Sequence, residues 1–180
     1  MKKDLRVLTY SGMLTALSLA LELSLAFPII AAAPYLLYAP GDLPILFIVY
    51  LFGAIPGIIA VAINASLFVL IRGEGGPYGL IMHFLAASAF VGIFSIFTRK
   101  RNIVHLITGL ALGTIARALI MIPANLIFTP LYLKVPITVV KGMIIPVIIP
   151  FNILHSGINS ILFVLLYLLL KNVLDSFKFK

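Results

Sequence analysis

Apolar segments long enough to cross a membrane follow one another along almost the whole chain. A helix that spans the hydrocarbon core of a bilayer needs about 20 such residues. A further, shorter segment follows "APGD" and ends at "GAIPG", where Gly and Pro favour a tight turn. We therefore predict an all-α integral membrane bundle of six transmembrane helices, in a single domain over residues 1–180. The expected helices are Leu5 to Phe27, Leu43 to Gly53 (the short one), Pro56 to Ile71, Tyr78 to Phe97, Ile103 to Phe128 and Phe151 to Leu170.

The scarcity of charge supports the same class. Hydrophobic residues make up 63% of the 180 residues and charged residues 10%, whereas soluble domains have roughly 45–50% apolar and about 25% charged residues. The net charge of +8 could suggest a nucleic-acid partner, but the sequence offers no soluble basic domain to bind one. We expect a lipid membrane around the chain and no nucleic acid. The absence of cysteine excludes disulfides and thiol chemistry.

The positive charges predict the orientation of the chain. With the N-terminus inside, nine Lys and Arg residues fall at inner helix ends and three in outer loops, which follows the positive-inside rule and makes both termini cytoplasmic. A cleaved signal peptide over residues 1–33, ending at "AAAP", fits less well, because its apolar stretch exceeds the usual length of about 7–15 residues. The inner residues are Lys2, Lys3, Arg6, Arg99, Lys100, Arg101, Lys171, Lys178 and Lys180, and the outer ones are Arg72, Lys134 and Lys141.

Two outer segments are long for simple connections. They are "FPIIAAAPYLLYAPGD" (27–42) and "TPLYLKVPITVVKGMIIPVIIP" (129–150), both apolar and interrupted by Pro. Loops longer than about 12–15 residues are often lids or binding loops. We expect both to be long apolar outer loops that either cover a site or dip into the membrane interface.

Polar residues inside the spans predict a pocket. Asn152, His155 and Asn159 follow the i, i+3, i+7 spacing, so they share one face of the last helix. Unpaired polar groups in hydrocarbon cost several kcal/mol, so this face must look into the bundle. Other helices place polar groups in the same outer half or slightly deeper, which indicates a pocket open to the outside. These groups are Glu22, Asn64, His83, Arg117 and Asn125.

Structural explanations compete with this pocket. Amides can simply join helices in a membrane, most of all the deeper Asn64 and Asn159. Glu22 and Arg117 are expected to pair, since each charge costs about 2.5–3.5 kcal/mol at mid-bilayer on insertion scales. Asp42 precedes a helix that starts with "LP", so it is expected to be an N-cap.

No enzyme signature occurs in the sequence. The chain lacks G-x-x-x-x-G-K-[ST] and H-E-x-x-H, its carboxylates are isolated, and its three histidines have no carboxylate cluster beside them. We therefore expect no catalytic residues, no metal site and no enzyme activity.

The first helix carries small residues at every fourth position, namely Gly12, Ala16 and Ala20. Such a small-residue ridge permits the close approach of another helix. Glu22 lies about 160° around the helix from Ala20, so if Glu22 faces inward the ridge faces a partner or lipid. Packing within the same bundle is the alternative.

Four segments together carry a family resemblance: "YLLYAPGDLPILFIVYLFGAIPGIIA" (35–60), "INASLFVLIRGEGGPYGLIMHFLA" (63–86), "RALIMIPANLIFTPLY" (117–132) and "PFNILHSGIN" (150–159). With the ridge and the outward pocket, they resemble the substrate-binding S components of energy-coupling factor (ECF) vitamin transporters. Those specific for riboflavin are the most similar. The resemblance covers most of the chain and implies the plasma membrane of a prokaryote.

The resemblance also implies roles for particular residues. In this family, an Asn late in the fifth helix and an N-x-x-K pattern at the start of the sixth helix hold the flavin. Asn125 matches the first Asn, and Asn152 matches the Asn of the pattern, whereas His155 stands where Lys is usual. Tyr38 and Asp42 would lie near a lid formed by the first outer loop, and His83 falls where relatives often have Glu. Asn64 completes the expected ligand-binding set. The ridge would dock to a transmembrane coupling subunit driven by two ATPases.

The resemblance makes riboflavin the expected substrate, with FMN as a second candidate, carried without any cofactor. The pyrimidine edge of the flavin presents acceptor, donor and acceptor groups that an amide can pair with. Alternatives remain open: an S component for thiamine or biotin, a membrane enzyme or assembly subunit that uses Glu22, Arg117 and His155, or a stand-alone carrier or channel. A thiamine site would favour carboxylates and aromatics around a cation, and only Glu22 is well placed for that.

Overall fold

The computed structural model describes residues 2–73, 75–100 and 102–176. Of the charges used above to orient the chain, Arg101, Lys178 and Lys180 lie outside these residues. The order is α1 (Lys2–Leu25), β1 (Phe27–Pro28), β2 (Leu37–Tyr38), α2 (Asp42–Phe52), α3 (Ala54–Arg72), α4 (Gly76–Thr98), α5 (Ile103–Leu133), α6 (Ile137–Met143), the π-helix η1 (Ile144–Ile148) and α7 (Ile149–Ser176).

All six expected helices are present within the described ranges. Five helical segments are long and apolar enough to cross a membrane: Leu5–Leu25, Ala54–Arg72, Gly76–Thr98, Ile103–Leu133 and Ile137–Leu174. The short helix α2 has 11 residues. Large apolar side chains such as Leu8, Leu70 and Leu169 are mostly exposed on the outside of the bundle, as expected where lipid is the solvent.

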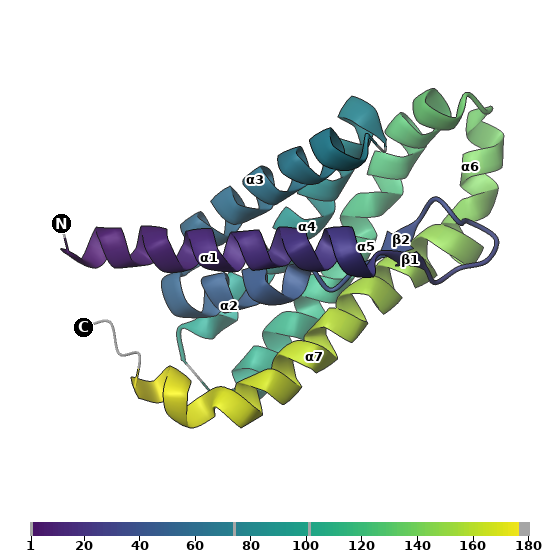
Figure 1. Cartoon of the computed structure of the whole chain (residues 1–180). Helices are drawn as coiled ribbons and strands as arrows, with labels where there is room; N and C mark the ends of the chain where they lie inside the picture. Colours follow the sequence, from purple (N-terminus) through teal and green to yellow (C-terminus); the bar gives the residue numbers. More distant parts are fainter. Residues whose placement is uncertain (1, 74, 101, 177–180) are drawn as a thin grey trace.

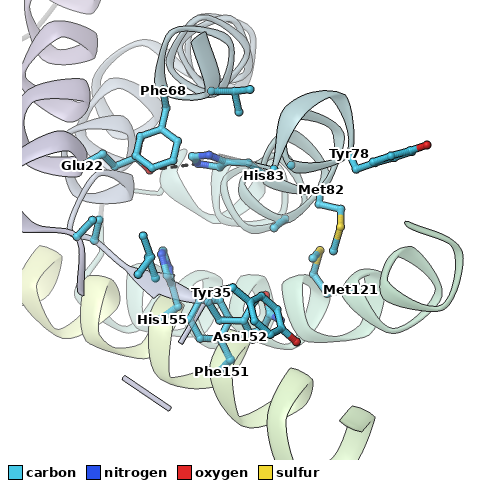
Figure 2. A pocket seen from close by; sticks show the side chains of 18 of the residues that line it. Glu22, Tyr35, Phe68, Tyr78, Met82, His83, Met121, Phe151, Asn152 and His155 are labelled. Atoms are coloured by element: carbon cyan, nitrogen blue, oxygen red, sulfur yellow. Dashed lines mark ion pairs between the residues drawn. The ribbon is translucent and has the colours of Figure 1, made fainter. Parts of the chain in front are cut away.

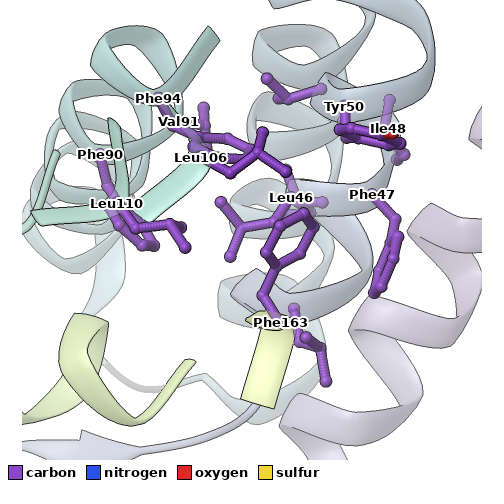
Figure 3. Close-up of a cluster of buried hydrophobic side chains, with 14 of the residues drawn as sticks. Leu46, Phe47, Ile48, Tyr50, Phe90, Val91, Phe94, Leu106, Leu110 and Phe163 are labelled. Atoms are coloured by element: carbon purple, nitrogen blue, oxygen red, sulfur yellow. The ribbon is translucent and has the colours of Figure 1, made fainter. Parts of the chain in front are cut away.

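The short helix α2 forms the centre of the bundle. Its residues Asp42 to Tyr50 are all buried, and it packs on α1, α3, α4 and α7. Figure 3 shows Leu46, Phe47 and Tyr50 of α2 in one buried cluster with Phe90 and Phe94 of α4 and Phe163 of α7. The Phe163 ring lies 4.8 Å from that of Phe47 and 5.2 Å from that of Phe94. A helix buried on every side needs no polar face, which explains its continuous apolar sequence.

Two glycines of α5 lie in close contact with α4. A Cβ on Gly113 would lie 2.7 Å from the backbone oxygen of Phe90, and one on Gly109 would lie 2.7 Å from the Cβ of Phe97. A Cβ on Gly92 of α4 would instead meet no atom within 4 Å. The two α5 glycines therefore set the spacing of this helix pair.

The two outer segments differ in structure. Segment 27–42 contains a small antiparallel hairpin, with Phe27 opposite Tyr38 and Pro28 opposite Leu37. Segment 129–150 is largely helical, so the expectation of a loop there was wrong. Pro130 lies inside α5, Pro136 precedes α6 and Pro146 lies inside η1. Prolines are tolerated in membrane helices because neighbouring groups satisfy the freed backbone.

The start of α1 and the end of α7 lie at the opposite end of the molecule from these outer segments. In Figure 1 those two helix ends are at the left, whereas the hairpin and α6 are at the right.

Candidate ligand-binding site

A cavity of about 390 Å³ lies at the end of the bundle that holds the hairpin. Its walls come from the end of α1, residues 34–37 and 39, and helices α3, α4, α5 and α7. The volume is within the range of small-molecule sites. Figure 2 shows labelled side chains from several of these elements around one space. The apolar and aromatic lining includes Tyr35, Phe68, Tyr78, Met82, Met121 and Phe151, and the polar lining includes Glu22, Arg72, His83, Arg117, Asn152 and His155.

Glu22 organises one side of the cavity. It is 4% exposed, its Oε1 lies 3.2 Å from Nε2 of His83, and its Oε2 accepts a hydrogen bond of 2.6 Å from Nδ2 of Asn64. The Glu22–His83 contact is the dashed line in Figure 2. Gly41 packs on this carboxylate so closely that a Cβ there would collide with it. The side chain is thus held from α3, α4 and the start of α2.

Asp42 organises the second polar cluster, behind the cavity wall. Its Oδ2 accepts a hydrogen bond of 2.6 Å from Nη1 of Arg117 and lies 3.5 Å from Nδ1 of His155. Arg117 Nε donates to Oδ1 of Asn152 at 3.3 Å, and Asn152 Nδ2 donates to the carbonyl of Ile148 at 2.8 Å. The cluster joins α2, α5 and α7. Each of the two buried carboxylates thus has polar partners of its own, and Arg117 compensates the charge of Asp42 within the bundle.

Two tyrosines of the segment 27–42 lie beside these clusters. Burial raises the pKa of Tyr35, so its hydroxyl stays protonated and can both donate and accept. Burial, and to a lesser degree the Asp42 carboxylate, raises the pKa of Tyr38. The Tyr38 ring packs edge-on against His155, with ring centres 5.2 Å apart. The hairpin therefore supplies part of the cavity wall and supports another part.

A family model described as "ECF transporter, substrate-specific component" matches residues 6–167. The chain belongs to this family. It is an S component.

Individual relatives agree with the family model. The chain is 35% identical to "Riboflavin transporter RibU" of Staphylococcus aureus (strain TCH60), over 97% of this chain and 94% of the relative. It is 28% identical to "Riboflavin transporter FmnP" of Bacillus subtilis (strain 168), over 89% of each chain. A solved structure titled "Structure and mechanism of the S component of a bacterial ECF transporter" matches with a TM-score of 0.81 and 33% identity, over 95% of this chain and 98% of that one.

These findings confirm the resemblance inferred from the sequence and the fold class. The S component is a multi-pass membrane protein with an all-helical bundle. Its relatives are named as transporters, so it is a transporter component and not an enzyme. Within the described residues, no group of three or more His, Asp or Glu could hold a metal ion.

The structure brings together most of the expected ligand-binding residues. His83, Asn152 and His155 line the cavity. Tyr38, Asp42 and Asn64 do not line it, but each contacts a lining side chain, as described above. Their contact with a ligand stays a prediction.

Asn125 lies apart from this set. Its Nδ2 donates to the Met121 carbonyl at 2.7 Å, and its Oδ1 accepts from Thr129 Oγ1 at 2.8 Å. Its amide is thus engaged within α5, and Met121, one turn earlier, lines the cavity instead. Its contact with a ligand also stays a prediction.

Two structural expectations were wrong. Glu22 and Arg117 do not pair, because Glu22 contacts His83 and Asn64 while Arg117 contacts Asp42. Asp42 is the first residue of α2 and not its N-cap, which is Gly41. The Asp42 carboxylate points to another helix because a buried guanidinium is a stronger partner than the backbone of its own first turn.

The sequence did not single out the aromatic and sulfur-containing lining. Tyr35, Phe68, Tyr78, Met82, Met121 and Phe151 all line the cavity, but the chain is so rich in apolar residues that their type carries no local signal. Only the arrangement of the helices identifies them.

The small-residue ridge lies on the outside of the bundle. Gly12, Ala16 and Ala20 are exposed, whereas Thr15, Ser18 and Glu22 on the other face of α1 are buried. The ridge therefore faces away from the bundle, as expected from the position of Glu22. Its use as a docking surface stays a prediction.

Proposed function

We propose that this S component binds riboflavin and captures it outside the cell for an ECF importer. The observation that carries the proposal is the cavity of about 390 Å³, walled by aromatic and Met side chains and a few fixed polar groups, in a chain whose relatives are named riboflavin transporters. A flat tricyclic ring suits such walls. FMN, which adds a phosphate to the same molecule, is the second candidate ligand.

The chemistry of the polar lining supports this ligand. Asn152 and Arg117 offer donors to the carbonyl groups of the ring, and Glu22, His83 and Tyr35 offer partners for the ribityl hydroxyls. Asn152, Arg117, Glu22 and His83 are each held by other protein groups, which limits the ordering that binding requires. A cationic ligand such as thiamine would meet two carboxylates that already have partners.

We further propose that the termini lie in the cytoplasm and that the cavity opens to the outside. Arg99, Lys100 and Lys171 lie at the helix ends nearest the termini, and the cavity lies at the opposite end. The positive-inside rule supports this orientation. The chain lacks a nucleotide-binding motif, so uptake requires energy from partners, namely a transmembrane coupling subunit and two ATPases.

Riboflavin binding is tested by fluorescence quenching on the protein purified in detergent. We expect near-stoichiometric quenching by the unaltered chain, and an affinity lower by about 100-fold or more in Asn152→Ala, because Arg117 also loses its Asn152 partner. Asn125→Ala tests the other expected amide in the same way.

Asn172→Ala is the matched control, because Asn172 is exposed at the far end of the same helix, and it should bind like the unaltered chain. If the unaltered protein leaves riboflavin fluorescence unchanged, the proposed function is wrong. Titrations with thiamine and biotin then decide between the alternatives.

The ridge is tested by Ala16→Leu, which adds bulk to the exposed face of α1. We expect riboflavin affinity within about twofold of the unaltered chain, but at least about tenfold less co-purification with a tagged coupling subunit, because a bulky side chain prevents close helix approach. Ala111→Leu makes the same change at an exposed position of α5 and should not affect association. Equal association of the two variants would contradict docking through the ridge.

A further inference from the structure

Arg117 has hydrogen-bonding capacity that the protein does not use. A guanidinium carries five N–H donors. Nη1 donates to Asp42 and Nε to Asn152, whereas no group among the described residues accepts a hydrogen bond from Nη2. The side chain is 4% exposed and lines the cavity. Nη2 is not among the fully enclosed side-chain atoms that lack a partner, so it is accessible from the cavity, and an acceptor can come from that space.

Asn152 offers a second donor on the same wall. Its Oδ1 is occupied by Arg117, and one amide hydrogen goes to the Ile148 carbonyl. A primary amide has two N–H donors, so one remains. Asn152 therefore offers a donor to this part of the cavity, while its acceptor oxygen is already engaged. Together with Nη2 of Arg117, it complements adjacent acceptor atoms of a heterocycle.

Asp42 controls the position of this guanidinium without touching the cavity. It is 1% exposed, is absent from the cavity lining, and holds Nη1 of Arg117 at 2.6 Å. A free arginine side chain has many rotamers, and fixing them opposes binding. The ion pair fixes the guanidinium before any ligand arrives.

We propose that Arg117 contacts the ligand directly, donating from Nη2 to a carbonyl oxygen of the flavin ring, and that Asp42 is a positioning residue that acts through Arg117. This inference rests on the proposed function. It makes Arg117 a determinant of specificity for ligands with an acceptor-rich ring edge.

The test measures affinity for riboflavin and for lumiflavin, which has the same ring without the ribityl chain. We expect Arg117→Gln to lower the affinity for both ligands by about 10- to 100-fold, the usual effect of losing a hydrogen bond to a charged group. Arg117→Lys, which keeps the pair with Asp42, should recover part of the loss. The infrared carbonyl band of bound flavin should move to higher frequency in Arg117→Gln, a change that a purely structural role would not produce.

The positioning role is tested by Asp42→Asn in two backgrounds. It should weaken binding in the unaltered chain but have little further effect in Arg117→Gln, because Asp42 acts through the arginine. Ser18→Ala is the control: Ser18 Oγ donates to the Gly41 carbonyl at 2.6 Å and ties α1 to the start of α2, without lining the cavity. We expect the riboflavin affinity of Ser18→Ala to stay within about twofold of that of the unaltered chain.

Several results would overturn the inference while leaving the proposed function intact. These are full affinity in Arg117→Gln, a loss seen for riboflavin but not lumiflavin, or an equal effect of Asp42→Asn in both backgrounds. If Arg117→Gln does not fold, the double variant Asp42→Leu/Arg117→Met takes its place, because it removes the donor together with its buried counter-charge. An unchanged affinity and carbonyl band in that variant would overturn the direct contact. Failure of the unaltered protein to bind either flavin would instead contradict the proposed function itself.

Discussion

Asp42→Leu is expected to lower the free energy of unfolding of the ligand-free protein by about 3–5 kcal/mol, the usual cost of removing one partner of a buried ion pair. The carboxylate is 1% exposed and Arg117 is 4% exposed. Removing the carboxylate leaves a cation in the centre of the bundle without its compensating charge. The measurement is unfolding by titration with a denaturing detergent in mixed micelles.

The double variant Asp42→Leu/Arg117→Met is the control for this result. It removes both charges and fills the space with apolar groups, which is often neutral or stabilising. We expect it to recover most of the stability while binding flavin poorly. A double variant less stable than Asp42→Leu would show that the pair is not the source of the effect.

Gly113→Leu is expected to be at least as damaging. Even a Cβ at this position would lie 2.7 Å from the Phe90 backbone oxygen and 2.9 Å from Cδ2 of its ring. Overpacking of a tight core costs about 1–3 kcal/mol and occasionally more, and here the neighbouring atom is backbone, which cannot rotate away. Gly113→Ala should already cost about 1–3 kcal/mol, measured in the same detergent titration.

Gly92→Ala provides the matched comparison on the facing helix, because a Cβ there meets no atom within 4 Å. It should leave stability unchanged or raise it by up to about 1 kcal/mol through helix propensity. If both alanine variants had the same stability, close packing at Gly113 would not be what sets the α4–α5 distance.

The helices could be predicted from the sequence because each depends on a local property. A span needs length and apolar character, and both are visible in the chain around Phe90 or Phe163. The wrong loop over 129–150 followed from reading Pro130 and Pro146 as helix breakers, which holds in water but less in a membrane. The inward face of α7 was also predictable, because Asn152, His155 and Asn159 share one stripe.

The partners of the charges could not be predicted in the same way. Glu22 and Arg117 lie at similar depths in the sequence-based arrangement of helices, so a pair between them was compatible with the sequence. Whether Glu22 contacts Arg117 or His83 depends on how each helix is rotated about its own axis. That rotation is set by long-range packing, for example by Gly41 against Glu22. The interior role of Asp42 likewise follows from the central place of α2, which no local pattern around "APGD" reveals.

The cavity draws its walls from residues as far apart in the chain as Glu22 and His155. No fragment that lacks α1 or α7 can contain it, so a ligand binds only the fully assembled bundle. By mass action, such a ligand raises the free energy of unfolding of the entire chain by about 2.7 kcal/mol when its concentration is a hundredfold above its Kd. Heat resistance in detergent thus becomes a general screen for transported molecules, including those with no colour or fluorescence.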